Sequence, residues 1–470
     1  MKQVGIMILA LVVCIKVTAQ NNTAVKLQTA WNVFTKDAQL KYALTGICVM
    51  DAETGTVLFE KNSNTGMAPA STQKVITTIA SFEAFGPSFQ YQTSIGYTGK
   101  LTGRKLLGDL VITGTGDPTL ASSRYTISNE NALLANITNA IKNAGIDTIV
   151  GNIIGTDKGF DLNPIPDNWI WGDMGNYYGA GHWAINWNEN QYDLFVKPGN
   201  KLNEPVQIAG TNSALIDTEE IVNDVKTGKA GTGDASVIYA DPFSTTTLFQ
   251  GTLESTKNKV SGAIPNADLF ALNSIKNYLQ ANKIFIKGEA KNNLDLYQNK
   301  IPKPTSVTNL YTQSSPTLDS IVYWFLKKSL NLYGEALVRT IGIEKKGVGS
   351  TAMGLEWIDS FYTANGFDTE AIHMYDGSGL SPANRVTPYA MTKALYFAKR
   401  RSWFSYFYDA LPLYNGMKLK SGTINGVRCF TGYHTASNGK KYVIAILINN
   451  YDNSKGSVTP KIFKVLDALK

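Results

Sequence analysis

The sequence contains little cysteine, little histidine and little charge. Its 470 residues include 3 Cys and 3 His, and 17% of them are charged whereas 43% are hydrophobic. Three cysteines without a C-x-x-C pair exclude a disulfide-rich scaffold and the usual zinc and redox motifs. Three histidines without an H-E-x-x-H pattern exclude the best-known signature of zinc hydrolases. The high apolar content excludes a disordered chain or a coiled coil.

Positive charge is in slight excess, but it is spread along the chain. The 44 Lys and Arg residues against 37 Asp and Glu give a formal net charge of +7. Because no run of five like charges occurs, we expect no nucleic-acid partner. The length predicts two or three domains, each large enough to bury a core.

The first nineteen residues have the layout of a secretory signal peptide. Lys2 precedes an apolar run over residues 4–15, and Val17-Thr18-Ala19 places small residues before a cleavage point at Gln20. The run is shorter than the roughly 20 apolar residues of a membrane-spanning helix. We therefore expect an exported protein, periplasmic or associated with the cell envelope, with no transmembrane segment in the mature chain.

Two cysteines, Cys48 and Cys429, remain beyond the predicted signal peptide, each in an apolar, strand-like stretch. Buried free thiols and a disulfide are both compatible with this pattern, because the sequence does not supply the Cα separation that a disulfide requires. We favour free thiols.

The order of predicted elements indicates an α+β fold. Strands are expected within 43–60 and 418–449, and helices over 71–85, 320–341, 353–365, 387–401 and 459–469. Strands at both ends with helices between them predict one antiparallel sheet flanked by helices.

A different character is expected in the middle of the chain. Residues 96–302 show short strand patterns, many Gly and Asn, and two amphipathic helices at 131–144 and 269–282. We interpret 96–302 as a large, mainly β insertion of one or two small, nested domains, and residues 20–95 and 303–470 as one discontinuous domain around it.

A serine and a lysine with catalytic spacing open the first predicted helix. In Ser71-Thr72-Gln73-Lys74, the spacing of three places both functional side chains on one helix face. A serine hydroxyl needs an adjacent base, and a neutral lysine could serve if its pKa were lowered by roughly 3 units from about 10.4. Desolvation and a second nearby cation lower a lysine pKa. The same S-x-x-K pattern recurs at Ser437 to Lys440, where Asn-Gly indicates a hairpin turn.

Two further segments have the form of motifs that accompany S-x-x-K in a known three-motif signature. Ser329-Leu330-Asn331 lies late in the predicted helix that begins near Ser320, and Lys420-Ser421-Gly422-Thr423 opens a predicted strand. Gly422 lacks a side chain where a ligand backbone could approach closely. The order S-x-x-K, S-x-N, K-[ST]-G is the signature of serine β-lactamases and penicillin-binding proteins.

Four segments narrow the resemblance to one family: Pro69 to Lys74, Gly114 to Thr119, Asp376 to Ser381 and Lys420 to Thr423. They closely resemble the S13 family, the class C low-molecular-weight penicillin-binding proteins that act as D-alanyl-D-alanine carboxypeptidases and endopeptidases. The long interval between the first two motifs also fits, since that family carries extra domains there. The resemblance covers nearly the whole mature chain, and it implies a β-lactamase/transpeptidase-like form of the α+β fold.

The resemblance implies roles for the first two motifs. Ser71 would be the acylated nucleophile and Lys74 its base. Ser329 would relay a proton to the leaving D-alanine, and Asn331 would bind the substrate amide. The backbone N–H groups of Ser71 and Thr423 would form the oxyanion hole.

The third motif and one distant acid receive binding roles by the same resemblance. Lys420 would supply a positive field, and Ser421 and Thr423, on either side of Gly422, would hold the terminal carboxylate. Asp157 would meet the free amine of the peptidoglycan side chain. No metal and no organic cofactor are implied. We interpret Asp376-Gly377-Ser378-Gly379 as a turn near the site.

The resulting hypothesis is a serine DD-peptidase that cleaves D-Ala-D-Ala or D-Ala–diamino acid cross-links of peptidoglycan, with β-lactam antibiotics as covalent inhibitors. A β-lactamase is an alternative, although no E-x-x-L-N motif lies between the first two motifs. A non-catalytic wall-binding or penicillin-sensing protein is another.

Six aromatic residues could form either a sugar-stacking surface or a buried core: Trp169, Trp171, Tyr177, Tyr178, Trp183 and Trp187.

Overall fold

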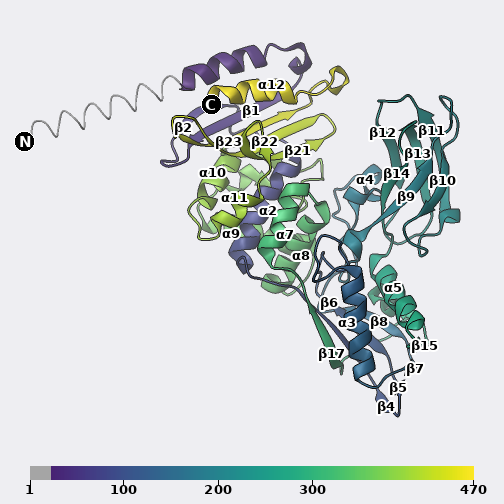
Figure 1. Ribbon diagram of the computed structural model, residues 1–470. Coiled ribbons are helices and arrows are strands. Elements are labelled where there is room, and N and C mark those ends of the chain that lie inside the picture. The colour runs from purple at the N-terminus through teal and green to yellow at the C-terminus, as the bar shows by residue number, and fades with distance from the viewer. Residues whose placement is uncertain (1–22) are drawn as a thin grey trace, which may run out of the picture. The chain divides into compact units, whose positions relative to one another are not determined.

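The structure is a computed structural model that describes residues 23–470 (Figure 1). The predicted signal peptide lies outside the described residues. The chain packs as two compact units. The first unit comprises residues up to Glu83, Val322–Ser329 and Ile358–Lys470, and the second comprises Ala84–Ile321 and Leu330–Trp357. The domain limits at 96 and 302 stay a prediction.

A six-stranded sheet built from both chain ends is the centre of the first unit. Its order is β2-β1-β23-β22-β21-β20, and every neighbouring pair is antiparallel. The predicted α+β class with an antiparallel sheet is therefore confirmed. The strands are β1 (Leu44–Asp51), β2 (Val57–Lys61), β20 (Leu413–Tyr414), β21 (Met417–Ile424), β22 (Val427–Thr435) and β23 (Lys441–Asn449).

Helices cover both faces of this sheet, which explains why β1 and β23 are buried at nearly every position rather than at alternate ones. The helix at 23–34 and α12 (Thr459–Leu466) pack on one face, where Trp31 and Ile462 join a core with Val49 and Ile446 (Figure 1). On the other face, Thr392 contacts the Cys48 thiol. The helices of this unit include α2 (Lys74–Phe85), α10 (Pro388–Ala398) and α11 (Phe404–Ala410).

The two cysteines lie on strands that are separated by β23. Cys48 is paired with Ala445 and Cys429 with Leu447, so two interstrand spacings of about 4.8 Å lie between them. That separation exceeds the Cα distance of about 7 Å that a disulfide tolerates. Both thiols are free and buried, and burial raises the pKa of each to about 12. They are therefore packed as inert apolar groups.

The second unit holds four sheets. A five-stranded sheet, β16-β8-β6-β3-β17, and a four-stranded sheet, β15-β7-β5-β4, share a core with α3 (Glu130–Asn143) and α5 (Ala267–Ala281). Both helices confirm predicted ones. The strands are β3 (Gln92–Tyr97), β4 (Lys100–Thr102), β5 (Lys105–Leu107), β6 (Leu110–Gly114), β7 (Thr148–Ile149), β8 (Ile153–Asp157), β15 (Phe285–Ile286), β16 (Ala290–Lys291) and β17 (Thr308–Ser314).

Two three-stranded sheets, β10-β9-β14 and β11-β13-β12, enclose a separate core that includes Leu194, Phe249 and Leu253. Their strands are β9 (Gln191–Lys197), β10 (Gln207–Thr211), β11 (Ile221–Gly228), β12 (Asp234–Tyr239), β13 (Thr247–Glu254) and β14 (Lys259–Ala263). The short helices α4 (Trp171–Met174) and α6 (Asn293–Gln298) also belong to the second unit.

The continuous helix predicted over 320–341 is wrong. The chain forms α7 (Leu318–Lys328), leaves the helical conformation at Ser329 and Leu330, and then forms α8 (Asn331–Lys346). Ser329 has φ 59°, in the left-handed region that ends a right-handed helix. Apolar residues continue at helical spacing on both sides of the break, so the pattern predicts a single helix. The following helix is α9 (Thr351–Ala364). Within residues 23–470, no helix has the length and apolarity to span a membrane.

Candidate active site

Ser71 and Lys74 lie where a 3₁₀ turn passes into a helix. The predicted helix over 71–85 begins with η2 (Ala70–Gln73), and Lys74 is the first residue of α2. The Lys74 Nζ lies 3.0 Å from the Ser71 Oγ and donates to the Ser378 carbonyl at 2.7 Å. Lys74 is fully buried and Ser71 is half-buried. A desolvated amine thus contacts a hydroxyl that remains accessible.

Two glycines hold η2 from different segments. A Cβ on Gly422 of β21 would lie 2.5 Å from the Pro69 carbonyl oxygen and 3.0 Å from the Ser71 nitrogen. A Cβ on Gly379, which has φ +82°, would collide with the Ala70 carbonyl. Only residues without a side chain fit this closely. The chain's own η2 therefore approaches Gly422 closely, and the substrate-binding role of Gly422 stays a prediction.

The segment interpreted as a turn, 376–379, is hydrogen-bonded to η2 and the start of α2. The buried Asp376 carboxylate accepts hydrogen bonds from Gln73 Nε2 at 2.9 Å and from the Gly379 N–H at 2.8 Å. Thr77 Oγ1 donates to the Gly377 carbonyl at 2.6 Å. These bonds fix the turn so that the Ser378 carbonyl faces Lys74. The sequence placed this segment near the site but did not indicate this contact.

Lys420 and Ser329 form a second amine–hydroxyl pair. Lys420 Nζ donates to Ser329 Oγ at 3.0 Å and to the Ser421 carbonyl at 2.7 Å. The Lys420 side chain is 1% exposed. Burial, then the charge of Lys74, then that of Arg428 hold the pKa of Lys420 well below its usual value. Ser71, Lys74, Ser329 and Lys420 are thus gathered within the first unit.

The outer end of β21 carries hydroxyl groups. Ser421 Oγ donates to the Tyr414 hydroxyl at 3.2 Å. Thr423 is exposed, and its Oγ1 accepts a hydrogen bond from the Arg428 guanidinium. Arg428 lies directly opposite Thr423 on β22. The sequence carries no signal for Arg428, because only the strand pairing brings this residue to the third motif.

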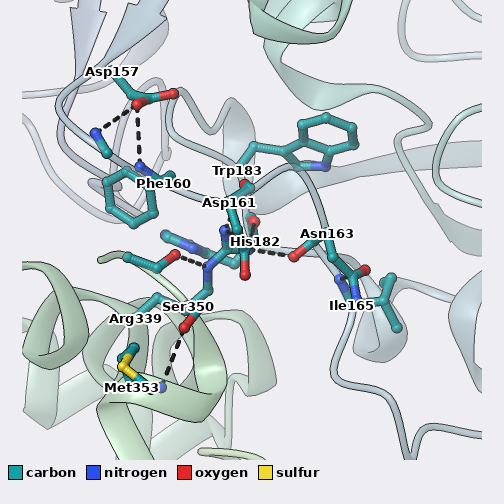
Figure 2. Close-up of polar contacts among 12 residues, drawn as sticks. Asp157, Phe160, Asp161, Asn163, Ile165, His182, Trp183, Arg339, Ser350 and Met353 are labelled. Carbon is teal, nitrogen blue, oxygen red and sulfur yellow. Dashed lines mark hydrogen bonds and ion pairs between the residues drawn. The ribbon is translucent and has the colours of Figure 1, made fainter. Parts of the chain in front are cut away.

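The remaining two predicted site residues belong to the second unit. Asn331 begins α8, and its Nδ2 donates to the Tyr178 carbonyl at 2.8 Å. Asp157 ends β8 with its side chain 2% exposed. Its carboxylate accepts hydrogen bonds from the Phe160 N–H at 3.1 Å (Figure 2) and from Asn293 Nδ2, and it pairs with Lys303 at 3.1 Å. These partners occupy part of the acceptor capacity of the carboxylate, and the amine-binding role of Asp157 stays a prediction.

A buried arginine organises the loop that follows Asp157 (Figure 2). Arg339 of α8 is 2% exposed and donates to the carbonyls of Asn163 at 2.9 Å and His182 at 2.7 Å, and to the Asp161 carboxylate at 2.7 Å. A cavity of about 20 Å³ beside this loop has room for about one water molecule. Its lining includes Asp157, Asp161, His182, Asp268 and Asn293.

Burial dominates the ionisation of this region. It lowers the pKa of His182 to about 3 and raises that of Asp268 to about 7. Among the residues that the structure describes, no group of three His, Cys, Asp or Glu side chains could hold a metal ion. The aromatic cluster left open by the sequence divides: Trp169, Trp183 and Trp187 are buried, whereas Trp171 and Tyr177 are half exposed.

Comparisons with known proteins show the family of this chain. The family model of the D-Ala-D-Ala carboxypeptidase 3 (S13) family matches residues 27–469. The chain belongs to this family. It is therefore a serine-type D-Ala-D-Ala peptidase, a serine DD-peptidase.

Two relatives show how far the family likeness extends. A D-alanyl-D-alanine carboxypeptidase of Actinomadura sp. (strain R39) is 25% identical, over 92% of this chain and 82% of that protein. The D-alanyl-D-alanine carboxypeptidase DacB of Haemophilus influenzae is 24% identical, over 86% of this chain and 85% of that protein. The crystal structure of penicillin binding protein 4 (dacB) from Haemophilus influenzae has a TM-score of 0.78 at 22% identity and covers 93% of this S13 chain and 97% of its own. This last likeness shows the fold.

Proposed function

We propose that this DD-peptidase uses Ser71 as its nucleophile and Lys74 as its base. The observation that carries the proposal is the 3.0 Å contact between Lys74 Nζ and Ser71 Oγ, with the amine fully buried. Two buried amines, Lys74 and Lys420, repel each other, which favours a state in which one of them is neutral. A neutral Lys74 accepts the Ser71 proton as the oxygen attacks the carbonyl carbon of the penultimate D-alanine.

The same attack creates a negative oxygen that needs hydrogen-bond donors. Gly422 lies against the Ser71 nitrogen, so the next peptide N–H along β21, that of Thr423, is close to it. We assign these two N–H groups to the oxyanion hole. Donors of this kind stabilise the tetrahedral intermediate by about 3 kcal/mol each in other acyl-transfer enzymes.

The leaving amine needs a proton when the peptide bond breaks. Ser329 Oγ, hydrogen-bonded to Lys420 Nζ at 3.0 Å, is placed to pass a proton to the departing D-amino acid and to recover one from the lysines. Water then attacks the acyl-serine ester, which releases the shortened peptide and restores the Ser71 hydroxyl. Asn331, two residues beyond Ser329, keeps the amide-binding role that the family resemblance implies.

We assign peptidoglycan stem peptides as the substrate and β-lactams as covalent inhibitors. A structure of penicillin binding protein 4 from Haemophilus influenzae in complex with a β-lactam has a TM-score of 0.73 to this chain. A substrate in the cell wall requires that the enzyme leaves the cytoplasm, and the predicted signal peptide at residues 1–19 supplies the means. Export and a periplasmic location are part of this proposal.

A fluorescent penicillin tests the nucleophile and the base. We expect covalent label on the wild type, none on Ser71→Ala, and acylation slowed about 10²- to 10⁴-fold in Lys74→Ala. The chain offers a matched control, because Ser437 and Lys440 repeat the motif in an exposed turn. Ser437→Ala and Lys440→Ala should label at the wild-type rate. Label that survives in Ser71→Ala would refute the assignment.

Cross-linked muropeptides test the reaction itself. Liquid chromatography with mass spectrometry resolves D-alanine release from cleavage of the bridge between stems. Either product, absent in Ser71→Ala, supports the proposal. A wild type that hydrolyses penicillin rapidly but releases neither product would be a β-lactamase instead, and one that neither labels nor cleaves would be a binding protein.

A further inference from the structure

Arg428 is a half-buried cation beside the third motif for which the described chain supplies no acid. Its Nε donates to Thr459 Oγ1 at 2.9 Å, and one terminal nitrogen donates to Thr423 Oγ1. Its planar group lies 4.7 Å from the centre of the Phe430 ring. Across residues 23–470, neither an Asp nor a Glu side chain forms an ion pair with Arg428.

The surroundings of Arg428 add positive charge rather than remove it. Lys420 lies three positions before Thr423 on β21, and it too has no ion pair within the described residues. Arg428 is one of the two cations that lower the pKa of Lys420. Burying two cations near each other is costly unless an anion offsets their charge. The strand pair is therefore arranged for an anionic ligand.

The family resemblance assigns the terminal carboxylate to Ser421 and Thr423; we propose that Arg428 also binds it, as the α-carboxylate of the amino acid that leaves the substrate. This inference rests on the proposed function. Because Thr423 Oγ1 accepts a hydrogen bond from Arg428, the hydroxyl can donate its own hydrogen to a carboxylate oxygen. Arg428 uses two of its five N–H groups on its own chain, which leaves three for the ligand.

The proposed ligand is common to both reactions of a DD-peptidase. A terminal D-alanine and the D-centre of a cross-linked diamino acid each carry a carboxylate on the carbon next to the leaving nitrogen. β-Lactams with a ring carboxylate carry the same charge. Arg428 therefore selects for the carboxylate rather than for one of these substrates, and replacing that carboxylate with a neutral group should abolish the benefit of the arginine.

Paired substrates measure this selectivity. We compare an N-acetylated peptide ending in D-Ala-D-Ala with its C-terminal carboxamide, and benzylpenicillin with its methyl ester. A charge-assisted hydrogen-bond pair corresponds to about 10- to 100-fold in kcat/KM. We expect the wild type to prefer each carboxylate by at least that factor. The preference should fall about 10- to 100-fold in Arg428→Ala, mainly through KM, because a ground-state contact is removed.

Two variants separate charge from hydrogen bonding. Arg428→Gln keeps a donor for Thr423 but loses the charge, and it should lose most of the preference. Arg428→Lys keeps the charge and should recover part of it. Arg400→Ala, which removes an exposed arginine from the same unit, should change nothing. If Arg428→Ala fails to fold, as a melting curve would show, the Gln and Lys variants still decide.

Different results would contradict the role of Arg428 and the proposed function. If Arg428→Gln retains the full preference for the carboxylate, the proposal is wrong, because the charge is then not what selects. The same conclusion follows if activity on the carboxylate and on the carboxamide falls equally. Failure of the proposed function is different: it would appear as absence of Ser71-dependent acylation in the wild type, before any Arg428 variant is made.

Discussion

The substitution Gly422→Ala inserts one methyl group between β21 and the turn that carries the nucleophile. The new Cβ would lie 2.5 Å from the Pro69 carbonyl oxygen, 2.9 Å from the Thr72 nitrogen and 3.0 Å from the Ser71 nitrogen. All three neighbours are backbone atoms, so no side chain can rotate away. Ordinary contact begins at 3.4 Å, which requires β21 and η2 to separate by about 0.9 Å.

That separation should affect catalysis more than folding. Overpacking of one methyl group costs typically about 1–3 kcal/mol of stability. A displacement of about 1 Å at reacting groups costs on the order of 10²-fold in rate. The shift would change the distance between the two proposed oxyanion donors, the N–H groups of Ser71 and Thr423. We therefore expect Gly422→Ala to fold and to be acylated about 100-fold more slowly.

The rate of acylation by a fluorescent penicillin, beside a denaturant melt, measures both effects. Gly66→Ala is the matched control, since its new Cβ would meet only the Arg385 Cβ at 3.6 Å, an ordinary contact. Acylation of Gly422→Ala within twofold of the wild type, at comparable stability, would show that the close approach of β21 to η2 does not set the geometry of the site.

Three further predictions concern buried charge. Lys420→Met should abolish activity but raise stability by about 1–2 kcal/mol at pH 7, because it removes a buried ammonium. Since the pKa of Lys420 is lowered in the fold, wild-type stability rises with pH between that lowered value and about 10.5. The difference in stability between variant and wild type, measured by denaturant melts, should therefore narrow at alkaline pH. Asp268 has a raised pKa of about 7 against 3.8, so the folded state holds its proton more tightly and wild-type stability should fall as the pH rises from about 4 to 7. Asp268→Asn keeps an acceptor for the Ile185 N–H and should flatten this dependence, with a gain at pH 8 of up to about 4 kcal/mol; parallel pH–stability curves would contradict this. Arg339→Met should destabilise the protein by about 3–5 kcal/mol, because it leaves the Asp161 carboxylate and several carbonyls without their donor, whereas Lys346→Met on the exposed surface should stay within about 0.5 kcal/mol in the same melts.

Much of the fold could be predicted because it follows from local patterns. The helices near 131–144 and 269–282 were found by apolar spacing, and the antiparallel sheet by strands at both chain ends. The break at Ser329 could not be found in this way, since apolar residues continue at helical spacing through α7 and α8. One left-handed residue changes the chain direction without changing that spacing.

Part of the candidate site could likewise be predicted from the sequence, and part could not. The motif residues were identifiable because their order along the chain is distinctive, whereas their supporting contacts are between segments far apart in sequence. Gly379 against Ala70 and Ser378 against Lys74 join residues about 300 positions apart. The surroundings of Asp157 are another example: the donors beside it, such as Asn293 and Lys303, are visible only in the fold, and its amine-binding role stays a prediction.

The buried positive charges of the site lower the stability of the fold. Lys420 is almost fully buried, and Arg428 lies half-buried on the neighbouring strand with no ion pair to an acid among residues 23–470. A fold selected for stability alone would favour apolar residues at both positions, because replacing buried charges by apolar residues is often neutral or stabilising. The charges are therefore explained by what they bind. A carboxylate ligand offsets them, so benzylpenicillin should protect the Ser71→Ala variant against thermal unfolding more than its methyl ester does, and equal protection by the two would contradict this explanation.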